Sequence, residues 1–91
     1  MSRLISLTLL TKPGCHLCEE AIKAVDLVVS AFRDQNSDDV QLDLTEVNIL
    51  ENDELNQKYA EEIPVLQING ETHAYWRIDS ERLIKALNDL A

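Results

Sequence analysis

The spacing of apolar residues changes along the chain between the rhythm of a strand and that of a helix. Residues 4–10 are almost continuously apolar, which predicts a central strand buried on both faces of a sheet. From residue 15 to residue 34, apolar side chains recur at helical spacing, which predicts an amphipathic helix of about five turns. The stripe consists of Leu17, Ala21, Val25, Val28 and Phe32.

The middle of the chain predicts a second strand and a short helix. Apolar and polar residues alternate from residue 40 to residue 45, as in a strand with one polar face. The alternation changes phase before Val47, so we expect a bulge or the end of the strand there. Residues 52–60 predict a short helix with Leu55 and Tyr59 inward.

The last third of the chain predicts a hairpin followed by a helix. Residues 65–68 and 72–78 flank Asn69-Gly70, a pair that suits a tight two-residue turn. Asp79 or Ser80 can cap a final helix, because both side chains accept hydrogen bonds from free backbone amides. In this reading Trp76 either faces solvent as part of a partner-binding surface or lies under the last helix.

Charge and length narrow the class of protein. The 91 residues suffice for one domain over residues 1–91, and a second would be too small to bury a core. Seventeen acidic and eight basic residues give a net charge of −9, which repels nucleic acid and anionic membranes. No apolar run approaches membrane-spanning length, so we expect a cytoplasmic protein. Together with the negative charge, this predicts neither nucleic acid nor membrane as partner.

Cys15 and Cys18 are the two cysteines of the chain, and they stand where the predicted strand gives way to the long helix. A helix start has unpaired N–H groups and a partial positive charge, which favour a thiolate. A disulfide across three residues closes too short a loop to add much stability, so we interpret the pair as a redox dithiol. A metal or iron–sulfur site and an inert pair remain as alternatives.

Two motifs resemble those of glutaredoxins and their small relatives in the thioredoxin-fold superfamily. They are Thr11-Lys12-x-x-Cys15-x-x-Cys18 and Ile63-Pro64-Val65. The resemblance implies a thioredoxin-like α/β fold of order βαβ-α-ββα, with a four-stranded mixed sheet and helices on both faces. It also implies that Cys15 is the attacking cysteine, Cys18 the resolving one, and Pro64 a cis-proline that faces the dithiol.

The neighbours of the dithiol suggest further roles. Lys12 resembles the lysine that precedes the glutaredoxin motif, and its charge would stabilise a Cys15 thiolate. His16 would favour that thiolate when protonated, or accept the thiol proton when neutral. At a cis bond, the backbone of Ile63 and Pro64 can pair with an extended thiol substrate.

The surroundings of the proline differ from those of a glutaredoxin. Glu61 and Glu62 precede it where the resemblance implies cationic or neutral polar groups that hold glutathione. Ala74-Tyr75 stands where a Gly-Gly pair belongs, so carboxylates and bulk both oppose an anionic tripeptide. Arg77 restores some positive charge and is a candidate substrate-binding residue. Glutathione therefore stays an open co-substrate, and we expect no bound cofactor or metal.

The sequence predicts a monomeric thiol–disulfide oxidoreductase acting on protein or low-molecular-weight thiols and disulfides. The competing class is a non-catalytic binding module or redox switch, in which a strand edge or Tyr75-Trp76 contacts a protein partner. A metal or iron–sulfur carrier is the third class. The electron donor, glutathione or a reductase, does not follow from the residues.

Overall fold

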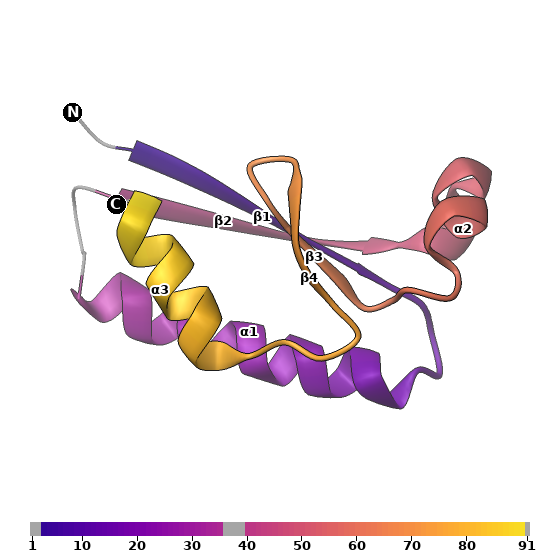
Figure 1. Cartoon of the computed structure of the whole chain (residues 1–91), viewed down its shortest axis with the longest axis horizontal. Helices are drawn as coiled ribbons and strands as arrows, with labels where there is room; N and C mark the ends of the chain where they lie inside the picture. The colour runs from indigo at the N-terminus through magenta and orange to yellow at the C-terminus, as the bar shows by residue number, and fades with distance from the viewer. Residues whose placement is uncertain (1–2, 36–39, 91) are drawn as a thin grey trace.

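The chain forms a mixed α/β fold whose elements follow the order predicted from the sequence (Figure 1). The computed structural model describes residues 3–35 and 40–90. The elements are β1 (Arg3–Thr11), α1 (His16–Gln35), β2 (Val40–Asn48), the 3-10 turn η1 (Ile49–Glu51), α2 (Asp53–Tyr59), β3 (Val65–Ile68), β4 (Glu71–Tyr75) and α3 (Ser80–Leu90). Asn52 begins α2 by accepting from the N–H groups of Glu54 and Leu55.

The strands form a four-stranded sheet in the order β2-β1-β3-β4, with β1 central as predicted. β1 and β2 pair in parallel, because α1 carries the chain back across the sheet between them. β3 runs antiparallel to both β1 and β4. The predicted mixed sheet is therefore confirmed.

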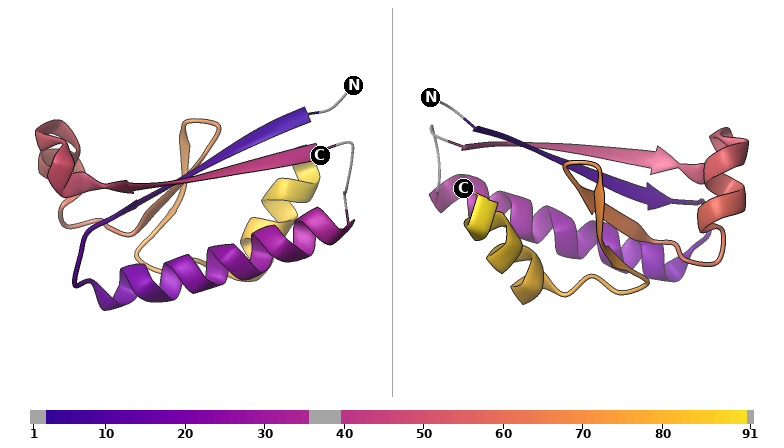
Figure 2. Two further views of the ribbon diagram at one scale, coloured as in Figure 1. Left: turned by 180° about the vertical axis from the view of Figure 1, so that it is seen from behind. Right: turned by 45° about the horizontal axis from the view of Figure 1, so that its top comes forward.

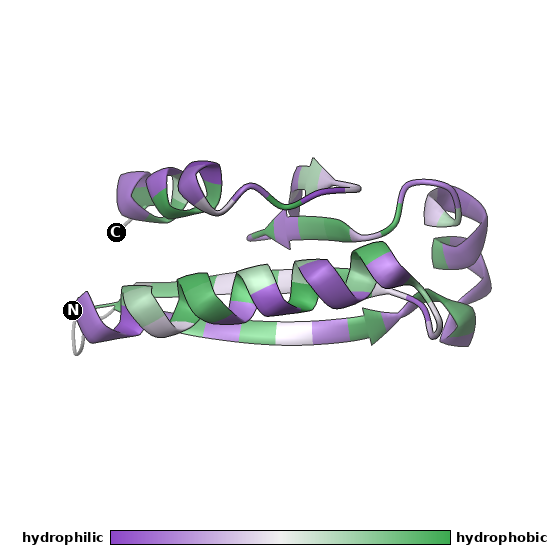
Figure 3. Ribbon diagram, turned by 90° about the horizontal axis from the view of Figure 1, so that it is seen from below, coloured by the Kyte–Doolittle hydropathy of each residue, from purple (hydrophilic) through white to green (hydrophobic). Residues whose placement is uncertain are grey.

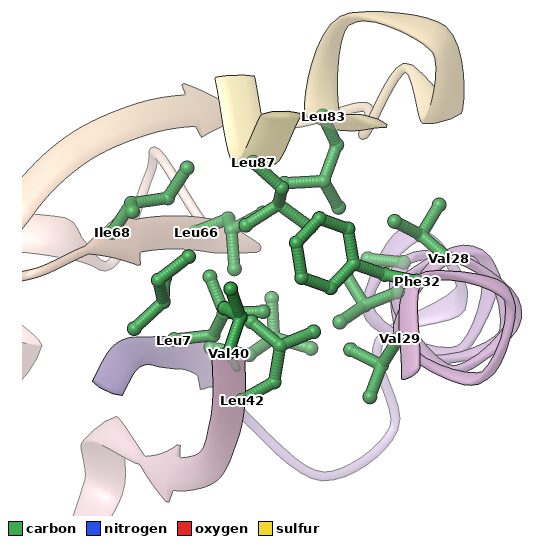
Figure 4. Packing of buried hydrophobic residues seen from close by; sticks show 14 residues of the cluster. Leu7, Val28, Val29, Phe32, Val40, Leu42, Leu66, Ile68, Leu83 and Leu87 are labelled. Carbon is green, nitrogen blue, oxygen red and sulfur yellow. The ribbon is translucent and has the colours of Figure 1, made fainter. Parts of the chain in front are cut away.

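The main hydrophobic core lies between the sheet and the two helices α1 and α3, which cover the same face (Figures 1 and 2). Figure 3 shows hydrophobic and hydrophilic residues alternating along α1, as an amphipathic helix requires. Side chains from both helices meet those of β1, β2 and β3 in Figure 4. The labelled members are Leu7, Val28, Val29, Phe32, Val40, Leu42, Leu66, Ile68, Leu83 and Leu87.

A second hydrophobic cluster lies on the other face of the sheet, where α2 covers one end. It contains Leu10, Cys18, Ile49, Tyr59, Ile63 and Val65, with Val47 and Leu55 packed against it. Val47 points to this cluster, whereas Leu42 points to the main core. The pairing of β1 and β2 continues without a shift to Asn48. The change of phase in β2 therefore reflects burial of opposite faces of the strand, first against the main core and then against the second cluster. The expected bulge or early end of this strand was wrong.

Two details of burial differ from the sequence expectation. β1 is buried on both faces towards its carboxyl end, at Leu9 and Leu10, whereas Leu4 is exposed. Leu17 is also exposed, although it lies on the apolar stripe of α1, because it stands in the first turn beyond the edge of the main core. Phe32 and Tyr59 are buried, as expected.

The hairpin has the predicted turn and a strand shorter than predicted. Asn69 and Gly70 both have positive φ, 52° and 85°, which matches a tight hairpin turn. The β3–β4 register shifts between Leu66 and Gln67, so the bulge of this sheet leaves His73 as the extra residue of β4. β4 ends at Tyr75, and Trp76 then adopts a φ of 67°.

Candidate functional site

The two sequence motifs meet at one end of the molecule. The carboxyl end of β1, the start of α1 and the connection from α2 to β3 gather there (Figures 1 and 2). Cys15, Cys18 and Ile63 belong to the same hydrophobic cluster, the one beneath α2. The fold thus brings together residues almost fifty positions apart in the sequence.

Cys15 stands directly before the first residue of α1 and is half-buried. Its Sγ accepts a hydrogen bond of 3.2 Å from the backbone N–H of Cys18. Its carbonyl oxygen accepts from the N–H of Glu19 at 3.1 Å, which closes the first helical turn. Cys15 therefore occupies the capping position, where free N–H groups and the helix dipole both favour a negatively charged sulfur.

Cys18 lies one turn inside the helix and is 2% exposed. The pKa of its thiol is raised to about 11, mainly by burial and next by the hydrogen bond with the Cys15 side chain. The backbone and the charge of Lys12 act the other way, although with smaller effect. Both cysteines are free thiols, so the structure describes the reduced pair.

The two predicted activating residues occupy different places. Lys12 lies on the loop before Cys15, and it lines the same cavity as both cysteines. The His16 side chain is 98% exposed, and its Nδ1 lies 3.8 Å from Glu19 Oε2. His16 therefore faces solvent on the first turn of α1, beside a carboxylate.

The loop before β3 contains a cis peptide bond between Ile63 and Pro64, as the resemblance implied. Ile63 is buried against the cysteine cluster, and its N–H donates to the Tyr59 carbonyl at 3.1 Å. The Pro64 carbonyl accepts from the N–H of Trp76 at 2.8 Å. The proline loop is thereby held between the end of α2 and the segment after β4.

An open cavity of about 230 Å³ adjoins the dithiol. Its lining includes Lys12, Cys15, Cys18 and Glu46. Glu46, on β2, was not among the residues singled out from the sequence, and its Oε1 accepts from the Thr11 hydroxyl at 3.3 Å. The alternation of β2 puts position 46 on the same face as Leu42, but the place of Glu46 beside Thr11 depends on the pairing of β2 with β1.

A second open cavity, about 480 Å³, lies beside the first turn of α1. We call its lining residues the Trp76 patch: Leu17, Tyr75, Trp76 and Arg77. The first three are large exposed hydrophobic residues, and Trp76 is 53% exposed. Trp76 therefore faces solvent, which resolves the two alternatives of the sequence analysis. Arg77, the candidate substrate-binding cation, belongs to this patch.

Neither a metal-ligating group of side chains nor a membrane-spanning helix is found in the described part of the chain. Within residues 3–35 and 40–90, no group of three or more His, Cys, Asp or Glu side chains is arranged to hold a metal ion. No described helix is long and apolar enough to cross a membrane.

Known proteins resemble this chain in sequence and in structure. The model of the Glutaredoxin-like domain family (DUF836) matches residues 6–88. The uncharacterized protein Rv0508 of Mycobacterium tuberculosis is 25% identical over 75 residues, which are 82% of this chain and 74% of that protein.

Solved structures share the fold. The X-ray structure of target protein XcR50 from X. campestris has a TM-score of 0.69 at 25% identity, covering 91% of this chain and 96% of that one. Thioredoxin 1 from Thermosipho africanus has a TM-score of 0.61 at 11% identity, with 93% and 92% covered, and shows the thioredoxin-like fold. Because the family model matches most of the chain, residues 6–88, the chain belongs to the family of glutaredoxin-like domains.

Proposed function

We propose that this protein is a small thiol–disulfide oxidoreductase that uses the Cys15–Cys18 dithiol. The observation that carries the proposal is the capping hydrogen bond from the Cys18 N–H to the Cys15 sulfur at the start of α1. The free N–H groups and the dipole of a helix start favour negative charge at that position, whereas burial keeps Cys18 protonated. One nucleophile and one protonated partner are what a two-step exchange needs.

In the first step, the Cys15 thiolate attacks one sulfur of a substrate disulfide. The substrate S–S bond breaks, a mixed disulfide with Cys15 forms, and the leaving thiolate takes a proton from water. Cys18 then loses its proton and attacks the Cys15 sulfur. The Cys15–Cys18 disulfide forms, the second substrate thiol leaves with a proton, and two electrons have passed from the dithiol to the substrate.

The surrounding residues have supporting roles in this proposal. Lys12 contributes positive charge beside the dithiol. The solvent-exposed His16, on the first turn of α1, favours the Cys15 thiolate when protonated or accepts the thiol proton when neutral. Because the Ile63 N–H already donates to Tyr59, a substrate backbone would pair with the Ile63 carbonyl beside Pro64. In this proposal the protein is a monomer in a reducing compartment such as the cytoplasm. There the cellular thiol pool keeps the pair in its reduced, electron-donating form.

The role of each cysteine is tested by two serine variants. Cys18→Ser should accumulate a mixed disulfide with substrate, because no thiol remains to attack Cys15. Cys15→Ser should show no turnover, because the nucleophile is gone. Mass spectrometry of the first variant and disulfide-reduction rates of both are the measurements, and equal residual rates would refute the assignment.

A redox titration separates the enzyme from a non-catalytic module or switch. A potential of about −200 to −270 mV with reversible oxidation supports exchange catalysis, whereas failure to oxidise reversibly supports the module. Comparing glutathione with a thioredoxin reductase as electron source then identifies the donor. Bound metal in protein purified without oxygen would instead favour the carrier.

A further inference from the structure

The Trp76 patch is an exposed apolar surface that the exchange chemistry itself does not require. Tyr75 and Trp76 meet edge to face, with ring centroids 5.2 Å apart and planes at 84°. Their cavity, about 480 Å³, is large enough for an amino-acid side chain. A large aromatic residue gains free energy when buried, so one that stays half exposed points to an external contact.

The exposed position of Trp76 is held by the structure around it. Its φ of 67° lies in the left-handed region, which a bulky residue adopts when its surroundings impose it. Its backbone N–H donates to the Pro64 carbonyl at 2.8 Å, and its indole Nε1–H donates to the Glu61 carbonyl at 3.0 Å. The indole is therefore fixed in place before any partner arrives, which lowers the entropy cost of binding.

The patch adjoins the first turn of α1, which carries the dithiol, and the proline loop. Leu17 stands between Cys15 and Cys18 in the sequence, and the backbone N–H of Trp76 donates a hydrogen bond to the Pro64 carbonyl. A third open cavity, about 360 Å³, shares Leu17, Trp76 and Arg77 with the Trp76 patch and continues along α1 past Glu20. A chain that enters the active site can thus extend over the patch and along α1.

The charge around the patch is mostly negative. Glu20 lines the cavity along α1. The Glu61 carbonyl accepts the hydrogen bond from the indole, and Glu62 is the next residue in the chain. The side chains of all three glutamates are exposed. Arg77 supplies a single positive charge within the patch. The whole chain carries a net charge of −9, which favours the approach of cationic over anionic partners.

We propose that the substrate is a disulfide-bearing polypeptide in which an apolar side chain and basic residues flank the reactive cysteine. This inference rests on the proposed function and specifies its substrate class. The apolar side chain occupies the Trp76 patch, and the basic residues face the carboxylates of Glu20, Glu61 and Glu62. Oxidised glutathione, a small anionic disulfide, lacks the apolar group and meets like charge.

Reduction rates under single-turnover conditions test the substrate class with no electron donor present. Fully reduced protein is mixed with four disulfides: a basic peptide with an apolar residue beside cysteine, its acidic counterpart, oxidised glutathione, and neutral hydroxyethyl disulfide. The basic peptide should react about tenfold faster than the acidic one, and added salt should narrow this ratio. Equal rates for the two peptides, with hydroxyethyl disulfide reduced, would overturn the inference and leave the proposed function standing.

Variants identify the surface responsible. Trp76→Ala should lower the rate for the basic peptide relative to hydroxyethyl disulfide by about tenfold. Leu27→Ala is the matched control, because Leu27 is a 72% exposed apolar residue of α1 outside the patch. If Trp76→Ala does not fold, the pair Glu20→Gln and Glu61→Gln should reduce the ratio of basic to acidic peptide severalfold. An unchanged ratio in these variants would count against the proposal.

A binding measurement keeps the docking surface separate from the redox chemistry. Trp76 is the single tryptophan of the sequence, so its fluorescence reports on the patch. The double variant Cys15→Ser/Cys18→Ser should bind a cysteine-free basic peptide with an apolar residue and change its fluorescence, whereas the acidic peptide should not. Binding without reduction of any disulfide by the native protein would refute the proposed function alone. Equal binding of both peptides would refute the inference.

Discussion

The buried thiol of Cys18 makes the stability of this protein depend on pH in the alkaline range. Its pKa is about 11 in the folded state, against an ordinary value of 9.0, mainly because burial disfavours the thiolate. The folded state therefore keeps this proton at a pH where the unfolded chain has lost it. Stabilisation of the folded state by this thiol, complete below pH 9, is lost as the pH rises through 9 to 11.

The size of the effect follows from the two pKa values. At pH 7 the thiol is protonated in both states, so its titration does not alter the free energy of unfolding. At pH 10 ionisation favours the unfolded state by a factor of about ten, which corresponds to about 1 kcal/mol. Above pH 11 the loss approaches its limit of about 3 kcal/mol, the equivalent of the full difference between the two pKa values.

Urea unfolding of the native protein and of Cys18→Ala at pH 7 and pH 10 measures this effect. The variant retains the N–H that donates to the Cys15 sulfur, and titrating groups that do not interact with Cys18 cancel in the difference between the two proteins. The advantage of the native protein over the variant should be about 1 kcal/mol smaller at pH 10 than at pH 7. A difference that stays constant within about 0.3 kcal/mol would refute a strongly raised pKa for Cys18.

In the proposed cycle, the same pKa delays the second step until the first is complete. At pH 7 about one Cys18 thiol in ten thousand is ionised, about a hundredfold fewer than at the ordinary pKa. The hydrogen bond with Cys15 is the second cause of the raised pKa. Formation of the mixed disulfide changes that partner, so ionisation of Cys18 becomes easier once substrate is attached.

Two further variants test how the fold is held. Asn52→Ala should destabilise the protein by about 1 kcal/mol, because the N–H groups of Glu54 and Leu55 both lose their capping acceptor; urea unfolding measures the loss, and no change would contradict the role of the cap. Leu87→Ala should cost about 2–5 kcal/mol, because Leu87 is fully buried between α3 and the sheet, whereas the exposed Leu27→Ala should stay within about 0.5 kcal/mol in the same assay.

The order of the elements was predictable because each apolar rhythm reflects a local face that must be buried. α1 and the alternation at the start of β2 are read this way, since their buried residues point to the main core, apart from Cys18 in the first turn of α1. Val47 was misread for a physical reason. A strand that contributes to two cores changes its buried face without any bulge, and the second core is visible only when α2 is placed.

The cysteines and the cis-proline were predictable as motifs, whereas the position of Glu46 depends on strand pairing. Parallel pairing sets Leu9 beside Glu46 and Thr11 beside Asn48, which brings the Glu46 carboxylate to the Thr11 hydroxyl and the cavity of the dithiol. No local pattern encodes a register between residues 37 positions apart. The place of Glu46 in the lining of this cavity therefore follows from the assembled sheet.

The end of β4 shows how one backbone angle decides between core and surface. A strand that continued through Ile78 would place Trp76 on the face of Ala74, which pairs with the buried Leu66. The positive φ at Trp76 ends the strand instead, and the two hydrogen bonds to the proline loop hold the indole outward. The residue that terminates the sheet thus becomes part of the exposed Trp76 patch. A substitution that restores a regular strand there would be expected to remove this patch while leaving the dithiol in place.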